Sequence, residues 1–275
     1  CLLMNDLFGK DASSLKEKKL FLFDMDGTIY EDQRVFAGAL ELLSTIRRLG
    51  GKYVFITNNS STSVRDYLQR LKAMGIEAQP DNFFTSAQAT ALYLKEKHPG
   101  QLAYCLGTRS LLQEFRDSGI AVTGQVDDRA EVIVVGFDTE LTYAKIRQTC
   151  EMLSKDLPYL ATNPDLACPA EFGFVPDCGA ICEMLALATG KRPLFLGKPN
   201  AAMVDYVVRN SVFSKEQTVV IGDRLYTDIA LGVNAGVSTV CVLTGEAQLT
   251  DIEASSSKPE FVLPSVQEIL TILAE

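Results

Sequence analysis

Two aspartates, one residue apart, follow a short apolar run near the start of the chain. Residues 20–23 are too few for a helix and are predicted to form a buried strand, after which come Asp24 and Asp26. A carboxylate can attack a phosphate as a nucleophile, and a second carboxylate can protonate the leaving alkoxide and then deprotonate water. We therefore expect Asp24 to be the nucleophile of a phosphoryl transfer and Asp26 to be its general acid and base.

Polar groups of the kinds that this chemistry requires follow three further apolar runs. Residues 53–56, 194–196 and 218–221 are also predicted to be short buried strands. Ligands bind outside the carboxyl ends of the strands in a doubly wound sheet, so we expect the side chains after these strands to converge on one crevice. They are one hydroxyl, two amides, one ammonium and two carboxylates, namely Thr57, Asn58, Asn59, Lys198, Asp223 and Asp228.

The charges of these residues predict a metal-dependent site. A carboxylate that approaches a phosphate dianion is repelled, and like unit charges ~4 Å apart cost about 4 kcal/mol at an effective dielectric constant of about 20. We expect Asp24, Asp223 and the backbone carbonyl of Asp26 to hold Mg²⁺, an ion that prefers oxygen ligands. Lys198 would neutralise charge on the nucleophile and on the phosphate, and Thr57 would donate a hydrogen bond to a phosphoryl oxygen.

Short strands that alternate with helices predict the fold class. The helical patterns end at glycines, which supply the left-handed conformation that terminates a helix; they cover residues 39–49, 64–74 and 178–189. Apolar runs without polar alternation are typical of parallel strands that are covered on both faces. The sequence therefore predicts an α/β protein with a doubly wound, parallel, Rossmann-like core sheet.

A second set of strand and helix patterns separates the first two strand ends from the last two. It includes predicted strands at 103–106, 132–135 and 159–161 and predicted helices at 110–117 and 144–153. We interpret this set as an inserted α/β cap domain at residues 87–192. Residues 1–86 and 193–275 would then form the core domain, and both domains have ordinary sizes.

Composition narrows the possible function classes. The 26 Lys and Arg residues against 35 Asp and Glu give a formal net charge of −9, which disfavours a nucleic-acid surface. A single histidine leaves little room for Ser-His-Asp chemistry, and the seven cysteines include no CxxC pair. No apolar stretch approaches the ~20 residues that span a bilayer, and residues 1–19 lack the pattern of a secretory signal. We therefore expect a cytoplasmic protein that binds a small phosphorylated metabolite and neither membrane nor nucleic acid.

The motifs resemble those of the haloacid dehalogenase superfamily, and in particular its NagD-type branch. The resemblance covers nearly the whole chain and rests on DMDGT from Asp24, TNNSS from Thr57, ATNPD from Ala161, GKP from Gly197 and GDRLYTDI from Gly222. It implies that Asp24 is the nucleophile and Asp26 the acid and base, and that Thr57 and Lys198 hold the phosphate. It also implies that Asp223 holds Mg²⁺ with support from Asp228, that a large α/β cap lies between the second and third motifs, and that two copies can pair through their caps.

The cap segment at residues 163–176 bears on the substrate. It is expected to overhang the phosphate, and it contains no Lys or Arg. We therefore predict a neutral leaving group, such as a nucleoside, a sugar or an aryl group, packed on Phe172 or Phe174. We expect Asn58, Asn59 and Asn163 to be among the residues that bind this substrate.

Several alternatives remain open from the sequence alone. The protein could prefer phosphoglycolate or pyridoxal phosphate, could pass the phosphoryl group to a sugar as a phosphotransferase or phosphomutase, or could be an inactive phosphate-binding module. Individual residues also have structural interpretations: Thr57 could cap the next helix, Asp228 could interact with a helix dipole, and Phe172 and Phe174 could belong to the core of the cap.

Overall fold

The computed structural model describes residues 4–170 and 172–275. The chain divides into two compact units. We call the first the core unit; it comprises the chain through Thr57, Tyr67–Phe84 and Lys198–Glu275. We call the second the inserted unit; it comprises Asn58–Asp66 and Thr85–Gly197.

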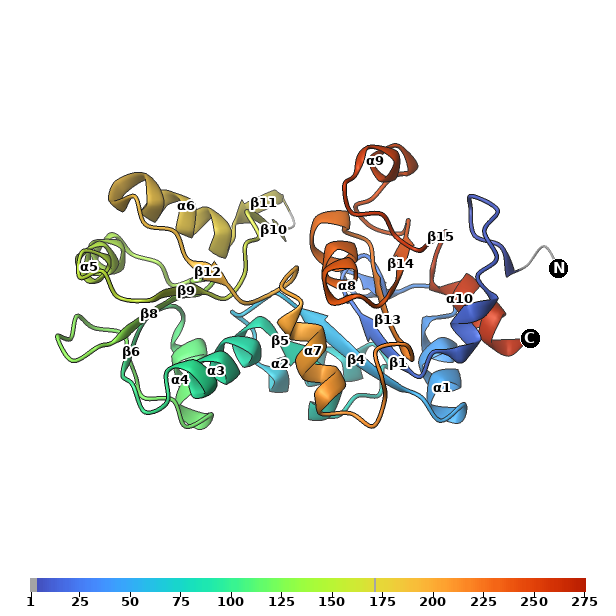
Figure 1. The fold of residues 1–275 in the computed structure, drawn as a ribbon, viewed down its shortest axis with the longest axis horizontal. Helices are drawn as coiled ribbons and strands as arrows, with labels where there is room; N and C mark the ends of the chain where they lie inside the picture. Colours follow the sequence, from blue (N-terminus) through green and yellow to red (C-terminus); the bar gives the residue numbers. More distant parts are fainter. Residues whose placement is uncertain (1–3, 171) are drawn as a thin grey trace. The chain divides into compact units, whose positions relative to one another are not determined.

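The core unit is built on a six-stranded sheet with the strand order β15-β14-β13-β1-β4-β5 (Figure 1). Strand β1 pairs in parallel with β13 and β4, and β14 pairs in parallel with β13 and β15. All four residues of β1 are buried, as expected for a strand that is covered on both faces. The strands are β1 (Leu20–Phe23), β4 (Lys52–Thr57), β5 (Phe83–Thr85), β13 (Thr218–Gly222), β14 (Ser238–Val242) and β15 (Phe261–Leu263).

Helices cover this sheet, and short turns connect them to the strands. Helix α1 packs on α10, and α7 packs on α8. The helices that lie wholly or mostly in the core unit are α1 (Ala39–Arg48), α2 (Val64–Ala73), α7 (Ala202–Arg209), α8 (Ala230–Ala235), α9 (Leu249–Ala254) and α10 (Val266–Ala274). Smaller elements are the hairpin of β2 (Tyr30–Glu31) and β3 (Arg34–Val35), 3₁₀ turns at Ser13–Glu17 and Pro80–Asn82, and a π turn at Leu225–Ile229. The doubly wound α/β prediction is confirmed.

The inserted unit has its own five-stranded sheet, in the order β12-β9-β8-β6-β7. These strands are β6 (Ala103–Leu106), β7 (Val122–Thr123), β8 (Val132–Val135), β9 (Tyr159–Ala161) and β12 (Leu194–Phe195). An antiparallel hairpin of β10 (Ala167–Ala170) and β11 (Gly173–Pro176) accompanies the sheet. The helices are α3 (Ser86–Lys97), α4 (Arg109–Asp117), α5 (Tyr143–Leu153) and α6 (Cys178–Thr189).

Strand β8 shows how helices cover both faces of this second sheet. Ile133 and Val135 belong to a hydrophobic cluster with residues of α5 and α6, such as Met152 and Leu185. The alternate residues of the strand, Val132 and Val134, belong to a different cluster that includes residues of α3 and α4. Because successive side chains of a strand point to opposite faces, the two helix pairs cover opposite sides of the sheet.

The glycines predicted to end helices have the expected backbone conformation. Helix α6 ends at Thr189, and Gly190 follows with φ 70°. Helix α1 ends at Arg48, and Gly50 lies just beyond it with φ 75°. Residues other than glycine rarely adopt this left-handed conformation, so these glycines stop the helices at the predicted places.

One strand prediction is wrong. Residues 194–196 were expected to form a strand of the core sheet, but β12 pairs in parallel with β9 of the inserted unit. Leu196 packs in the same hydrophobic cluster as residues of α3 and α4. A short apolar run predicts that a strand forms. It does not predict which sheet the strand joins, because that depends on the strand with which its backbone pairs. The division between the units consequently falls after Gly197 and not at residue 192, and residues 58–66 go with the inserted unit.

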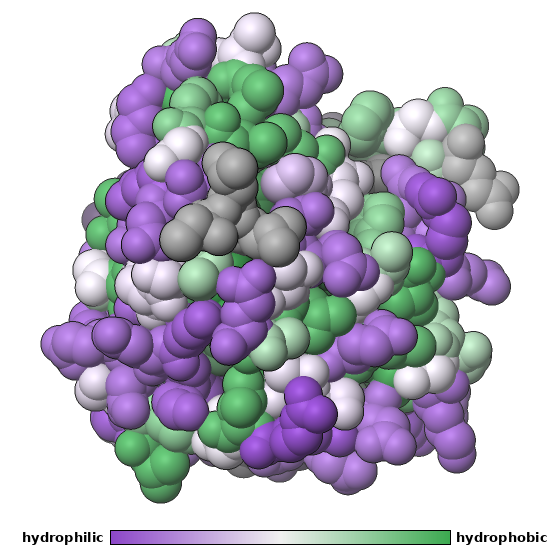
Figure 2. All heavy atoms as spheres, turned by 90° about the vertical axis from the view of Figure 1, so that its right-hand side faces the viewer, coloured by the Kyte–Doolittle hydropathy of each residue, from purple (hydrophilic) through white to green (hydrophobic). Residues whose placement is uncertain are grey.

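The described part of the chain contains no helix that is both long and apolar enough to cross a bilayer. Figure 2 shows one face of the molecule, on which hydrophilic side chains surround separate apolar groups. Such a mixture is ordinary for the surface of a globular protein. The six cysteines outside residues 1–3 are free thiols.

Candidate active site

Three carboxylates meet at the carboxyl ends of β1 and β13. Asp24 directly follows β1, Asp223 directly follows β13, and Asp228 lies in the π turn that comes next. Because Phe23 of β1 pairs with Ile221 of β13, the residues after the two strands are neighbours. One oxygen atom from each carboxylate lies within 4.8 Å of the other two. The fold therefore brings together three of the predicted site residues, although they come from distant parts of the sequence.

Lys198 places its ammonium group among these carboxylates. Its Nζ atom lies 2.7 Å from Oδ1 of Asp24 and 2.7 Å from Oδ1 of Asp228. It also donates a hydrogen bond of 3.1 Å to the carbonyl oxygen of Ile56, at the end of β4. The residue is only 4% exposed. Burial alone would lower the pKa of Lys198, but the charges of Asp228 and Asp24 outweigh burial and raise it, so the ammonium stays protonated.

The carboxylates repel one another in the absence of a further cation. Burial raises the pKa of Asp223, and the charges of Asp24 and Asp228 raise it further. Burial and the charge of Asp24 likewise raise the pKa of Asp228, although Lys198 opposes the change. A cluster of oxygen ligands with excess negative charge suits a hard divalent cation such as Mg²⁺. Asp24, Asp223 and Asp228 therefore fit the predicted metal site.

Two glycines let the backbone approach Asp223 closely. Gly27 has φ 78°, and a Cβ atom on it would lie 2.5 Å from Oδ2 of Asp223. A Cβ atom on Gly245 would lie 1.9 Å from the same oxygen. This close packing allows the Asp223 carboxylate to accept hydrogen bonds from the Thr28 hydroxyl, at 3.3 Å, and from the backbone N–H of Glu246, at 2.8 Å. The side chain is thus held in one orientation.

The Asp26 carboxylate is not a member of the three-carboxylate group. Its side chain is exposed, but neighbouring atoms remove part of its hydration, which raises its pKa. The charge of Arg70 opposes this change, and that of Asp24 adds to it. A carboxyl group with a raised pKa is better suited to donate a proton at neutral pH, which is the role that the sequence predicts for Asp26.

Thr57 is the last residue of β4 and is buried. Burial raises the pKa of Tyr67 to about 12, the neighbouring Thr57 side chain opposes this change, and the Tyr67 ring stacks on Phe83. Tyr67 was not predicted from the sequence, because a single aromatic residue on a helix looks like any core residue.

The three predicted asparagines lie in the inserted unit. The side-chain amides of Asn58 and Asn163 each donate a hydrogen bond of 3.3 Å to the carboxylate of Asp165, and Asn163 donates another of 3.1 Å to Asp177. Asn59 instead accepts hydrogen bonds from the backbone and hydroxyl of Ser61. Asp165 joins two of these residues and was not singled out from the sequence, where it is one of two acidic residues in a segment without Lys or Arg.

The two phenylalanines of the cap segment are not part of a hydrophobic core. Phe172 is 81% exposed and Phe174 is 70% exposed. Both lie at the hairpin of β10 and β11, and Phe174 pairs with Pro169 across it. The interpretation of these residues as core residues of the cap is therefore wrong, and their predicted contact with the leaving group stays a prediction.

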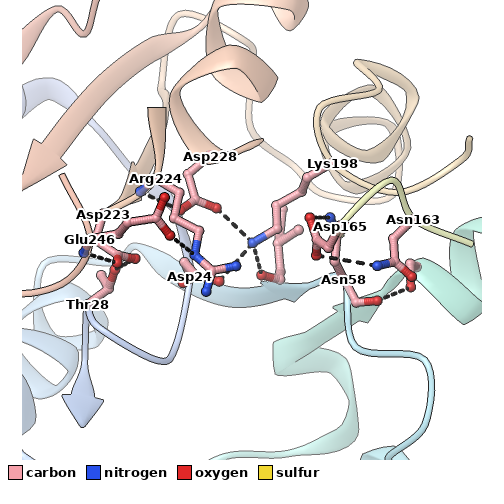
Figure 3. A network of polar contacts seen from close by, with 12 residues as sticks. Asp24, Thr28, Asn58, Asn163, Asp165, Lys198, Asp223, Arg224, Asp228 and Glu246 are labelled. Atoms are coloured by element: carbon pink, nitrogen blue, oxygen red, sulfur yellow. Dashed lines mark hydrogen bonds and ion pairs between the residues drawn. The ribbon is translucent and has the colours of Figure 1, made fainter. Parts of the chain in front are cut away.

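A cation that the sequence analysis also missed stands next to Asp223. The Nε atom of Arg224 lies 3.0 Å from Oε2 of Glu246. The ion pair joins the end of β13 to the loop after β14. Figure 3 shows Arg224 and Glu246 together with Asp24, Asp223, Asp228 and Lys198. Arg224 lies within the GDRLYTDI motif, but no role was predicted for it, because an arginine beside an aspartate is common on protein surfaces.

Comparisons with known proteins agree with this geometry. Two different family models match the chain. Residues 21–121 match one described as haloacid dehalogenase-like hydrolase, and residues 195–269 match a second one, described as HAD-hydrolase-like. The chain is 30% identical to an acid sugar phosphatase of Staphylococcus epidermidis, over 95% of this chain and 99% of the relative.

Solved structures give the same result. A 4-nitrophenylphosphatase of Thermotoga maritima is similar at a TM-score of 0.89 and 37% identity, with 94% of this chain and 99% of the other covered. NagD of Escherichia coli K-12 is similar at a TM-score of 0.84 and 31% identity, with 91% and 98% covered. The fold and the sequence agree over almost the whole chain, and the chain therefore belongs to the haloacid dehalogenase-like hydrolases of the NagD type.

Proposed function

We infer that this phosphatase transfers the phosphoryl group of a small phosphate monoester first to Asp24 and then to water. The observation that carries the proposal is the position of Lys198, which holds a buried ammonium between the Asp24 and Asp228 carboxylates. A buried lysine that is paired with a candidate nucleophile neutralises the charge that would otherwise repel a phosphate dianion.

Each residue then has a distinct role in the reaction. An oxygen of Asp24 attacks phosphorus while Asp26 donates a proton to the departing alkoxide; Asp26 next removes a proton from the water that cleaves the aspartyl-phosphate. Lys198 and Thr57 bind phosphoryl oxygens. A divalent cation held by Asp24, Asp223 and Asp228 would supply further positive charge.

The proposed substrates are monoesters with a neutral leaving group. Residues 163–176 contain no Lys or Arg, and Asp165 adds a negative charge to the segment. The names of the relatives, an acid sugar phosphatase and a 4-nitrophenylphosphatase, support sugar and aryl leaving groups. We expect the protein to hydrolyse sugar phosphates and p-nitrophenyl phosphate faster than phosphoglycolate or pyridoxal phosphate. A strong preference for phosphoglycolate would contradict the neutral-leaving-group proposal.

Phosphate release from this substrate panel, with Mg²⁺ and with EDTA, tests the proposal. Turnover in the Asp24→Asn variant should fall by at least about 10³-fold, because the nucleophile is lost. Asp128→Asn is the matched control: its side chain is exposed and pairs with Lys155 in the inserted unit. That variant should keep full activity. Turnover in Asp24→Asn at the wild-type rate would exclude Asp24 as the nucleophile.

Two further expectations also remain proposals. Pairing of two copies through the inserted unit can be tested by light scattering of the purified protein. A cytoplasmic location can be tested by fractionation of cells that express it.

A further inference from the structure

Arg224 is a second cation close to the candidate nucleophile, and the proposed function does not yet use it. Its side chain is 23% exposed and forms an ion pair with Glu246. The Tyr226 hydroxyl donates a hydrogen bond of 3.0 Å to the same Glu246 oxygen, Oε2. The carboxylate therefore holds the guanidinium on one side and is itself held by the phenol on the other.

Both partners of this ion pair donate backbone hydrogen bonds to candidate metal ligands. The backbone N–H of Arg224 donates to Oδ2 of Asp228 at 3.1 Å. The backbone N–H of Glu246 donates to Oδ2 of Asp223 at 2.8 Å. The positions of the guanidinium and of its carboxylate partner are thus set by the same two aspartates that would hold the cation, as Figure 3 shows.

The Arg224 side chain extends toward Asp24 but forms its ion pair with Glu246, as Figure 3 shows. Within the described residues, Arg224 has its ion pair with Glu246, whereas Asp24 has its ion pair with Lys198. Glu246 therefore holds the guanidinium, while the Asp24 carboxylate is paired with Lys198.

The charges of the site leave a role for the Arg224 guanidinium in phosphate binding. Lys198 and a divalent cation together would neutralise the three carboxylates of the site, so a bound phosphate dianion would still lack positive partners. A guanidinium has donors in a planar fork that matches two phosphate oxygens, and it stays protonated at any physiological pH. Resting on the proposed function, we propose that Arg224 binds the phosphoryl group directly and that Glu246 and Tyr226 are positioning residues that aim its guanidinium.

Substitution of Arg224 tests this proposal through phosphate binding as well as turnover. We expect Arg224→Gln to weaken binding of inorganic phosphate, measured by calorimetry in the presence of Mg²⁺, by about tenfold or more, because a charge-assisted contact is lost. The KM for p-nitrophenyl phosphate should rise by a similar factor. Arg224→Lys should recover part of both losses, because it restores the charge but not the fork. Arg129→Ala, which breaks an exposed ion pair with Asp127 in the inserted unit, is the control and should change neither quantity.

A double-mutant cycle tests the positioning role. Glu246→Ala should weaken phosphate binding in the wild-type background by less than Arg224→Gln does, and it should have no further effect in the Arg224→Gln background. Unchanged phosphate affinity and KM in folded Arg224→Gln would overturn the proposal and leave the ion pair a structural one. This outcome differs from failure of the proposed function, in which the wild-type protein itself would release no phosphate or Asp24→Asn would remain active.

Discussion

The negative charges of the carboxylates at the end of the core sheet and of those in the inserted unit are compensated by different kinds of partner. In the core unit, Asp24 and Asp228 share the ammonium of Lys198, and Asp223 lies within 4.8 Å of both. In the inserted unit, Asp165 receives side-chain amides from Asn58 and Asn163, and Asp177 receives the amide of Asn163 together with the backbone N–H of Cys178. The first cluster has more negative charge than it can neutralise, whereas the second has a donor for each acid.

This difference separates a reactive site from a structural network. Buried carboxylates that receive amide hydrogen bonds fix the local chain and need no ligand. Buried carboxylates that repel one another have raised pKa values, as Asp223 and Asp228 do, and a cation or a substrate must complete the arrangement. The core cluster thus needs a cation or a substrate to balance its charge, whereas each carboxylate of the inserted cluster already has a hydrogen-bond donor. The predicted binding of substrate by Asn58 and Asn163 stays a prediction.

The largest effect that the comparison predicts is on Lys198. Lys198→Met leaves buried carboxylates without their ammonium, and removal of one partner of a buried ion pair costs about 3 kcal/mol or more. We expect the free energy of unfolding, measured by urea denaturation in EDTA, to fall by about 3 kcal/mol and turnover to be lost.

Lys145→Met is the matched substitution in the inserted unit. Lys145 lies 2.9 Å from the buried carboxylate of Asp138, which also accepts the backbone N–H of Glu140. Because Lys145 is partly exposed and Asp138 keeps a donor, we expect a loss of about 1 kcal/mol and normal turnover. Equal losses of turnover in the two variants would remove the distinction between the clusters.

A smaller change in stability is expected when Mg²⁺ binds. Mg²⁺ should raise the unfolding temperature of the wild-type protein, because a ligand that binds only the folded state stabilises it by about 2.7 kcal/mol at a hundredfold excess over its Kd. The shift should disappear in Asp223→Asn, which loses a buried ligand of the core cluster. It should persist in Asp165→Asn, which alters only the inserted network. An identical shift in both variants, measured by differential scanning fluorimetry, would place the metal elsewhere.

The smallest effect concerns Glu114 of α4, a carboxyl group with a raised pKa but no role in either cluster. Burial, followed by the charge of Asp117, raises the pKa of Glu114 to about 7. A folded-state pKa above the unfolded value means that stability is lost as pH rises between the two values. One pKa unit corresponds to about 1.4 kcal/mol, and partial exposure reduces the effect of the whole shift.

We therefore expect Glu114→Gln to stabilise the protein by about 1 kcal/mol at pH 8 and by much less at pH 5, as measured by urea denaturation. The control is Glu183→Gln, because the exposed Glu183 has a pKa lowered by Arg192 and should show no gain at pH 8. A gain in Glu114→Gln that is equal at both pH values would mean that its charge is not the cause.

The sequence predicted most of the secondary structure because apolar runs and terminal glycines are local signals. The strands β1, β6, β8 and β9 and the helix α6 have the predicted bounds. Residues 194–196 were assigned to the wrong sheet, since pairing of β12 with β9 depends on contacts distant in the sequence. The position of Lys198 beside Asp24 was nevertheless expected, because the resemblance of GKP to a family motif implied it independently of that strand.

The residues that the sequence did not reveal act through side-chain partners from other segments. Tyr67 acts through Thr57, Asp165 through Asn58 and Asn163, and Arg224 through Glu246. No local pattern marks a residue whose importance comes from a partner that lies far along the chain.

Direct detection of the covalent intermediate tests the central claim that Asp24 is the nucleophile. The Asp26→Asn variant should accumulate it, because the base that activates water is missing. After rapid acid quench with p-nitrophenyl phosphate and Mg²⁺, mass spectrometry of the peptide that contains Asp24 should show one added phosphoryl group, which the Asp24→Asn/Asp26→Asn double variant lacks. Phosphate release by the wild-type protein with no phosphoryl group on Asp24 at any time point would contradict the account.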